Sequence, residues 1–397
     1  MDQAARAACR KSESPLRRLI AAVVFGLACA SPGMPPGGPP DKVAPQIIQI
    51  TPDSGSVAVR PKEVLFRFDE VVAEKPVSAT TLADLFLISP RDGVPKAYWH
   101  RDAISVKPAH GWRANTPYTV IMMPGLADIR GNVRNTGATT FFSTGPTIPR
   151  TRISGQVLDW VAGTSAAGAL VESFVQPDSL HPFVALVDTS GAFVLEHLPP
   201  ARYTVRAYLD RNKDLSIDPS EPWDSVSVNL ADSARTELLL FVHDTAAPRL
   251  RDVAAVDSIT FRLTFDKPID PAQTLTVANF AIVGPDSVPV PMASAGPEPK
   301  DTSVKAPAPA PRRAGVNPRV DTTVVRKAVM SRPVPISTVI IKLQRLLTPK
   351  LVYRVRAIGI RGLLGSTGNS DRPYTAPAPP PPPKPTVVPA KTPPVSK

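Results

Sequence analysis

Short apolar runs in which every second residue is apolar recur along most of this chain, and they constrain its fold more than any other feature. Turn residues such as Pro52-Asp-Ser-Gly55 and Pro90-Arg-Asp-Gly93 separate them. Such runs predict β-strands with one buried face, and short strands at regular spacing predict a sandwich. Because no amphipathic stretch of 12 or more residues persists, we expect an all-β fold of tandem sandwiches.

The runs fall into three groups, which predict three domains at residues 45–146, 150–243 and 247–372. The third group repeats the first, since Leu65-Phe-Arg-Phe-Asp69 has its counterpart in Leu263-Thr-Phe-Asp266. Residues 247–372 are therefore interpreted as a degenerate copy of the first domain.

Proline and basic charge are concentrated in a few segments, one of which interrupts the third domain. About half of the prolines, 24 of 49, lie in three stretches: 29–41, 297–335 and 373–397. The net charge of the chain is +12, and +11 of it comes from residues 1–28, 297–335 and 373–397. Segments of this composition bury too little apolar surface to fold, so we predict a disordered insert at 297–335 and a disordered tail at 373–397. The insert has no aromatic residue, and we expect no nucleic-acid binding.

The first 28 residues have the pattern of a signal peptide. Five Arg or Lys residues precede the apolar run Leu19–Ala28, which is too short to span a bilayer. Cys29 follows in Gly26-Leu27-Ala28-Cys29, which resembles a bacterial lipobox although Gly26 departs from the usual aliphatic residue. The resemblance implies lipidation of Cys29, a membrane anchor and a Pro/Gly linker at 29–44; soluble secretion is the alternative.

Two family resemblances follow from longer motifs. Phe66-Arg-Phe-Asp69, Asn115-Thr-Pro-Tyr118 and Asp128-Ile-Arg-Gly131-Asn132 make residues 45–146 similar to the SbsA-like bacterial Ig-like domain. Asp188-Thr-Ser-Gly191 and Leu198-Pro-Pro-Ala-Arg-Tyr203 make residues 150–243 resemble a carboxypeptidase-regulatory, transthyretin-like sandwich. Together they imply an exported lipoprotein with tandem Ig-like and transthyretin-like domains.

One loop has the spacing of a calcium-binding site. Oxygen-bearing side chains occupy positions 1, 3, 5, 7, 9 and 12 of an EF-hand-like loop: Asp210, Asn212, Asp214, Ser216, Asp218 and Glu221. Leu215 stands at the position where the sharp turn prefers glycine, and no helices flank the loop. A structural calcium ion is one interpretation, and an acidic, solvated inter-strand loop is the other.

Motifs for catalysis are missing from the sequence. Asp69-Glu70 and Glu74 have no nearby base or oxyanion donors. Four tryptophans, Trp99, Trp112, Trp160 and Trp223, could form a sugar-stacking platform, but they are spread over two domains, so we expect them to pack in cores or at edges. We therefore predict a protein that is not an enzyme: an envelope scaffold, binding or adhesion module, facing the periplasm or the cell surface. An envelope protein or glycan would be its partner; a part in envelope polysaccharide processing is the alternative.

Overall fold

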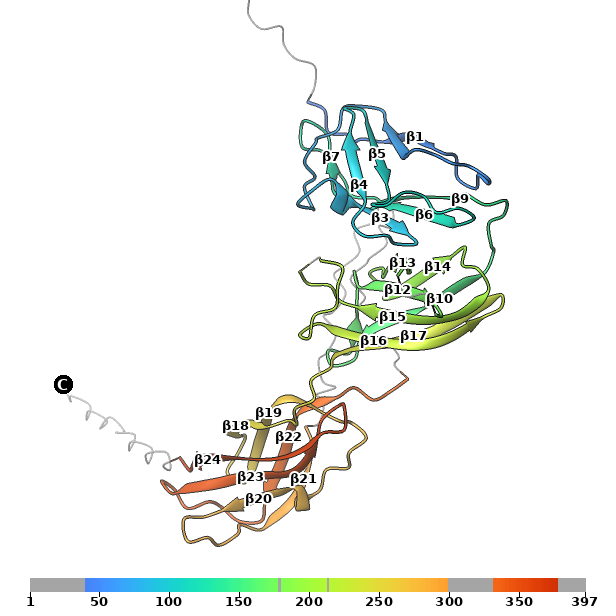
Figure 1. Ribbon diagram of the computed structural model, residues 1–397. Helices are drawn as coiled ribbons and strands as arrows, with labels where there is room; N and C mark the ends of the chain where they lie inside the picture. The colour runs from blue at the N-terminus through green and yellow to red at the C-terminus, as the bar shows by residue number, and fades with distance from the viewer. Residues whose placement is uncertain (1–39, 178–179, 213, 299–330, 378–397) are drawn as a thin grey trace, which may run out of the picture.

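The computed structural model describes residues 40–177, 180–212, 214–298 and 331–377. Three β-sandwich domains follow one another along the chain (Figure 1), which confirms the all-β prediction. Helical residues in the described ranges form two 3-10 turns, η1 (Ala83–Leu85) and η2 (Val277–Asn279). No helix in these ranges is both long and apolar enough to cross a bilayer.

Several predicted segments fall on residues that the structure does not describe. These are the signal peptide 1–28, Cys29, most of the linker 29–44, most of the insert 297–335 and most of the tail 373–397. The predicted boundaries of the linker, the insert and the tail are wrong where these segments meet the folded domains. Asp41 of the linker contacts Asn132, Pro297 of the insert is the last residue of a strand, and residues 373–375 of the tail belong to the last strand. Each forms backbone or side-chain hydrogen bonds with the adjoining domain, which composition alone does not reveal.

The first domain packs two antiparallel sheets around one core. One sheet has the strand order β1-β2-β5-β4, with β1 (Ile47–Thr51), β2 (Val64–Phe68), β5 (Ala103–Lys107) and β4 (Lys96–Trp99). The other has the order β3-β6-β9, with β3 (Phe86–Ser89), β6 (Pro117–Met122) and β9 (Ala138–Ser143). A small hairpin joins β7 (Leu126–Ala127) to β8 (Val133–Arg134). Phe66 and Phe142, one from each sheet, are fully buried between them.

The third domain repeats the strand order of these two main sheets, and the β7–β8 hairpin has no counterpart among its described strands. Its larger sheet has the order β18-β19-β22-β21, with β18 (Leu250–Ala255), β19 (Thr260–Ile269), β22 (Ile336–Leu343) and β21 (Met292–Pro297). The facing sheet has the order β20-β23-β24, with β20 (Phe280–Val283), β23 (Val352–Arg361) and β24 (Thr367–Thr375). The insert therefore lies between β21 and β22, in place of the short β4–β5 turn of the first domain.

Two side-chain contacts recur at matching places in the two copies. The Asp69 carboxylate accepts the Gln46 N–H at 2.7 Å, and the Asp266 carboxylate accepts the Arg249 N–H at the same distance. The hydroxyl of Tyr118 accepts the backbone N–H five residues earlier at 2.7 Å, and that of Tyr353 does so at 2.9 Å. The sequence repeat thus reproduces local structure as well as strand order.

The second domain is a sandwich whose eight strands form one continuous hydrogen-bonded sheet folded over its core. The order is β11-β10-β17-β16-β15-β12-β13, and β14 also pairs with β10. The strands are β10 (Arg152–Asp159), β11 (Thr164–Ser165), β12 (Leu170–Val175), β13 (Phe183–Leu186), β14 (Ala192–Glu196), β15 (Ala201–Tyr208), β16 (Pro222–Leu230) and β17 (Ser233–Val242). Only the β10–β17 pair is parallel among these described strands. Gly155 lies in that pair, where a Cβ would come within 1.9 Å of the Thr236 carbonyl oxygen.

Candidate functional site

The predicted calcium loop, residues 210–221, connects β15 to β16 and is closed by its own oxygen side chains. Asp210 accepts the N–H of Leu215 at 2.9 Å, and the Glu221 carboxylate accepts the N–H groups of Arg211 and Asp218 at 2.7 and 3.2 Å. Glu221 is 2% exposed. The first and last predicted ligands are therefore both turned into the loop.

The middle of the loop is held by an amide. The Asn212 side-chain nitrogen donates to the carboxylates of Asp214 and Asp218, both at 2.9 Å. Ser216 contributes its backbone N–H, which donates to Asp214 at 2.8 Å. A cation in this loop would take the place of the amide nitrogen, so Asn212 would have to turn its amide oxygen inward.

Leu215 departs from the glycine of calcium loops but keeps its backbone conformation, with φ +61°. Its side chain, together with Ile217, packs against Leu87 of the first domain and Tyr208 of the second. These apolar contacts favour leucine where loop geometry alone favours glycine. The loop is thereby part of the junction between the first two domains.

A fully buried glutamate holds that junction together. Glu172, in β12, is 0% exposed and forms ion pairs with Arg91 of the first domain and with Arg206 of β15, the latter at 2.5 Å. The hydroxyl of Tyr208 donates to the same carboxylate at 3.2 Å. Arg91 also donates to the Leu215 carbonyl oxygen at 2.9 Å, so one side chain connects the first domain to both the glutamate and the loop.

Sequence reasoning missed this network. Arg91 belongs to a predicted turn, Pro90-Arg-Asp-Gly93, and nothing local indicates a distant partner. Glu172 carried the one available signal, because a carboxylate inside the apolar strand Leu170–Val175 is expensive to bury unless it is paired. That signal predicts a partner without saying which residue supplies it.

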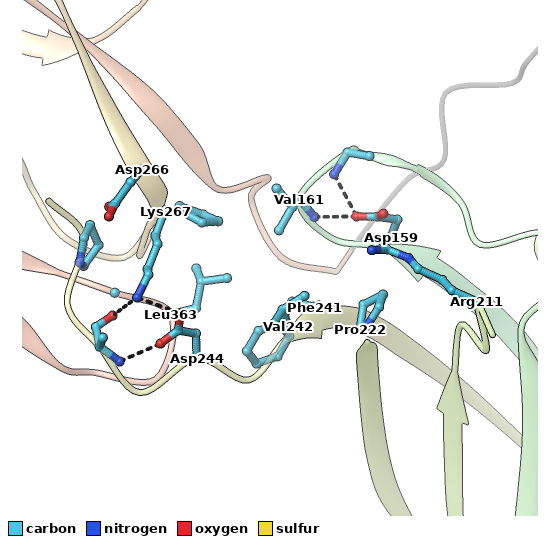
Figure 2. Close-up of a pocket in the computed structure, with 15 residues that line it drawn as sticks. Asp159, Val161, Arg211, Pro222, Phe241, Val242, Asp244, Asp266, Lys267 and Leu363 are labelled. Carbon is cyan, nitrogen blue, oxygen red and sulfur yellow. Dashed lines mark hydrogen bonds and ion pairs between the residues drawn. The ribbon is translucent and has the colours of Figure 1, made fainter. Parts of the chain in front are cut away.

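A cleft of about 490 Å³ separates the second and third domains (Figure 2). Asp159 and Arg211 of the second domain lie on one side, and Asp266 and Lys267 of the third lie on the other, with Phe241 between them. Apolar residues such as Val161, Pro222 and Leu363 complete the lining.

The carboxylates of this cleft already serve the fold. Asp159 accepts the N–H groups of Val161 and Ala162, and Asp244 pairs with Lys267 at 2.6 Å. The hydrogen bond from Lys267 and then that from the Ala246 N–H lower the pKa of Asp244. A carboxyl with a lowered pKa is ionised at neutral pH and is a poor general acid there, so Asp244 serves in this cleft as the ion-pair partner of Lys267.

The last residues of the predicted insert cross onto the second domain. The indole N–H of Trp160 donates to the Pro333 carbonyl oxygen at 2.9 Å, and the Arg332 guanidinium lies 5.7 Å from the Trp160 ring centroid. Leu363 of the third domain packs on the same apolar cluster, beside Phe241. Residues 331–335, here called the strap, thus belong to the junction of the second and third domains, where a segment without structure was predicted.

The carboxylates near Asp69 form a cluster with a neighbouring loop. Asp41, Glu70 and Asp128 offer oxygens within 4.8 Å of one another. Burial alone would raise the pKa of Asp128, but hydrogen bonds from the Asn132 side chain and from backbone N–H groups outweigh it and lower that pKa. Burial and then the charges of Asp128 and Asp41 raise the pKa of Glu70.

The tryptophans are used mainly for packing, as expected. Trp160 is 5% exposed, Trp112 packs edge-on against Tyr118 and Phe142, and Trp99 donates to the Val72 carbonyl oxygen at 2.9 Å. Trp223 differs, because it lines an open groove as well as stacking on a histidine.

Comparison with known families identifies the first domain. Residues 41–144 match the bacterial Ig-like domain family, which confirms the Ig-like resemblance of that domain. A comparison of the sequence with curated proteins finds no match.

Solved structures give weaker likenesses. The N-terminal part of the bacterial S-layer protein SbsC is 20% identical with a TM-score of 0.20, covering 33% of this chain and 24% of that one. Domains 1–6 of SbsC are 10% identical with a TM-score of 0.20, covering 85% and 55%. An L,D-transpeptidase from Mycobacterium smegmatis is 17% identical with a TM-score of 0.19, covering 50% and 77%. The chain spans about a quarter of the first of these, and at such TM-scores we draw no function from them.

Proposed function

We propose that this chain is a non-catalytic cell-envelope lipoprotein that acts as a scaffold and binding module, held to a membrane through Cys29. The observation that carries the scaffold role is the pair of domain junctions. The Glu172 network joins the first two domains, and the strap with Leu363 joins the last two. Junctions with buried polar and apolar contacts hold domains in a fixed relation, whereas bare linkers allow free motion.

The anchor is supported by the sequence before the first domain. An apolar run ends at Ala28, Cys29 follows, and the Pro/Gly segment beyond it would separate the folded part from the membrane. The bacterial Ig-like domain agrees with an exported protein. The second domain is proposed to be the transthyretin-like module that its Asp188 and Tyr203 motifs resemble.

Metabolic labelling with a fatty-acid probe tests the anchor. Wild type is expected to be labelled and to sediment with membranes, whereas Cys29→Ala loses the label and appears in the soluble exported fraction. Cys9→Ala is the matched control, since Cys9 is the other cysteine of the chain, and should behave as wild type. An unlabelled wild type, or a labelled Cys29→Ala, contradicts the anchor.

The non-catalytic role rests on how the carboxylates are used. Asp69 holds the Gln46 N–H at the edge of the first domain, and Asp266 repeats this contact in the third. Polysaccharide depolymerisation by the purified chain, measured as release of reducing ends, is expected to be zero. If reducing ends are released, and Asp69→Asn or Glu70→Gln abolishes their release, the result would instead support a role in polysaccharide processing.

We further propose that the 210–221 loop holds a structural calcium ion, because the carboxylates of Asp210 and Glu221 are turned into the loop and Leu215 already has the conformation of the calcium-loop turn. Calcium at about 100 times its Kd should add roughly 2.7 kcal/mol to the free energy of unfolding. Titration calorimetry and melting in calcium are compared for wild type and Asp214→Asn, with the exposed Asp232→Asn as control. No heat and an unchanged Tm in wild type contradict the site.

A further inference from the structure

An open groove runs across the outer face of the second domain, over β12, β15 and β16. It consists of two adjoining hollows of about 530 and 320 Å³ that share Arg206 and Trp223. Phe174, Thr204 and Ser225 line the first, and His243 lines the second. Neither hollow shares a lining residue with the cleft shown in Figure 2.

Strand register explains why these side chains gather there. Tyr203, Val205 and Ala207 of β15 point into the core, so Thr204 and Arg206 point outward. Antiparallel pairing then places Thr204 opposite Phe174 and Arg206 opposite Ser225, while Tyr208 lies opposite Trp223. The alternation of one strand thus builds a row of aromatic and short polar groups.

Both aromatic rings are held in place before any ligand arrives. The Arg206 guanidinium lies 4.8 Å from the Phe174 ring centroid. His243 stacks on Trp223 with 3.9 Å between ring centroids and 16° between planes, and Phe241 stacks on His243 at 4.2 Å. Rings fixed by their neighbours lose little conformational freedom on binding.

The charge of the groove selects against anions. Arg206 is already paired with the buried Glu172 at 2.5 Å, and Asp218 lines the second hollow. A nucleic acid or an acidic polymer needs unpaired cations, which the lining does not supply. What remains is a surface of aromatic rings with hydroxyl and guanidinium groups and the side-chain amide of Gln176.

We propose that this groove binds a neutral glycan chain, an assignment that rests on the proposed binding role and names its ligand class. Sugar rings carry apolar C–H faces that pack on aromatic rings and hydroxyls that form hydrogen bonds with polar side chains. Phe174 and Trp223 supply the former contacts, and Arg206, Thr204 and Ser225 the latter. The domains on either side leave this stretch open, because the first covers Leu170 and the third covers Phe241.

Affinity electrophoresis of the purified full chain tests the proposal. Gels run toward the cathode contain one soluble neutral polysaccharide each: amylose, mixed-linkage β-glucan, xyloglucan, galactomannan or dextran. Retardation is expected in at least one. Ser225→Leu fills the groove without removing a packed side chain and should weaken retardation at least tenfold, and Phe174→Ala should do the same. Ser233→Leu, at an exposed position at the start of β17 that lines neither hollow, should stay within twofold.

Two outcomes overturn the glycan site. One is the absence of retardation in all five polysaccharides, and the other is equal retardation of wild type and Ser225→Leu. If the chain binds the acidic polymer polygalacturonate and Ser225→Leu does not change that binding, the polysaccharide contacts the basic insert and tail and not the groove. None of these results alters the labelling of Cys29 or the test for depolymerisation, so the anchor and the non-catalytic role fail or stand separately.

Discussion

Replacing Arg91 should weaken the joint between the first two domains. Its guanidinium is 17% exposed and pairs with Glu172, which is 0% exposed, and it also donates to the Leu215 carbonyl oxygen. Arg91→Met keeps much of the side-chain volume and removes the charge together with both contacts. The variant therefore leaves a buried carboxylate with Arg206 and Tyr208 as its remaining partners.

The expected loss follows from the burial of that carboxylate. Deleting one partner of a buried ion pair typically costs about 3–5 kcal/mol, because the other charge stays buried. Since Arg206 still pairs with Glu172, we expect the lower end, about 3 kcal/mol. For a unit of about 200 residues this lowers Tm by roughly 6–12 °C.

Urea and thermal unfolding of the full chain measure this loss. Arg67→Met is the matched control, since Arg67 is an exposed arginine of the same domain, and it should change the free energy of unfolding by less than about 0.5 kcal/mol. The double variant Arg91→Met/Glu172→Gln removes the buried charge as well and should recover at least half of the loss. A loss below 0.5 kcal/mol for Arg91→Met, or a double variant no more stable than the single one, would refute the reasoning.

Spin labels report the joint directly. With Cys9 and Cys29 replaced by serine, labels at the exposed positions Lys75→Cys and Asn229→Cys report the distance between the two domains. A narrow distribution is expected, and Arg91→Met should broaden it. A broad distribution in the parent protein would mean that the joint does not hold the domains in one orientation.

Four further substitutions test individual features of the domains. Tyr118→Phe and Tyr353→Phe each leave a backbone N–H without its acceptor, so each should lower the free energy of unfolding of its own domain by about 1–3 kcal/mol; a loss in one copy alone would contradict their equivalence. Asp128→Asn should lower the free energy of unfolding at pH 7, because the pKa of Asp128 is lowered in the folded protein. The difference in stability between wild type and variant should be full above the ordinary carboxyl pKa and should shrink as the pH falls through the folded pKa. A difference in Tm that does not depend on pH would contradict this. Gly155→Ala should cost at least about 1–3 kcal/mol, since the new methyl group meets the Thr236 carbonyl, and an unchanged melting curve would exclude that clash.

Much of the local structure was predictable because alternation is a local property. The runs at 64–68 and 192–195 became β2 and β14, and the Asp69 and Asp266 motifs took the same place in two domains. What could not be predicted are contacts between residues far apart in sequence. The strap shows this, since the proline-rich composition of the insert predicted no structure, yet Pro333 accepts a hydrogen bond from Trp160.

The candidate sites divide in the same way. The six oxygen side chains of residues 210–221 could be identified by spacing, whereas the docking of Leu215 on Leu87 depends on a domain more than 100 residues earlier in the chain. The groove was invisible in the sequence, because Phe174 and Trp223 lie on different strands and come together only through the pairing of β12, β15 and β16.

The sequence by itself determined the fold class, the repeat and the inward or outward direction of each strand residue, because these depend on alternation and turns between near neighbours. Only the tertiary structure decided which charges meet, which loop lies at a joint and which face stays open. Arg91, Glu172 and Arg206 illustrate the reason. A buried carboxylate requires a cation, but the geometry of folding alone determines which arginine comes near it.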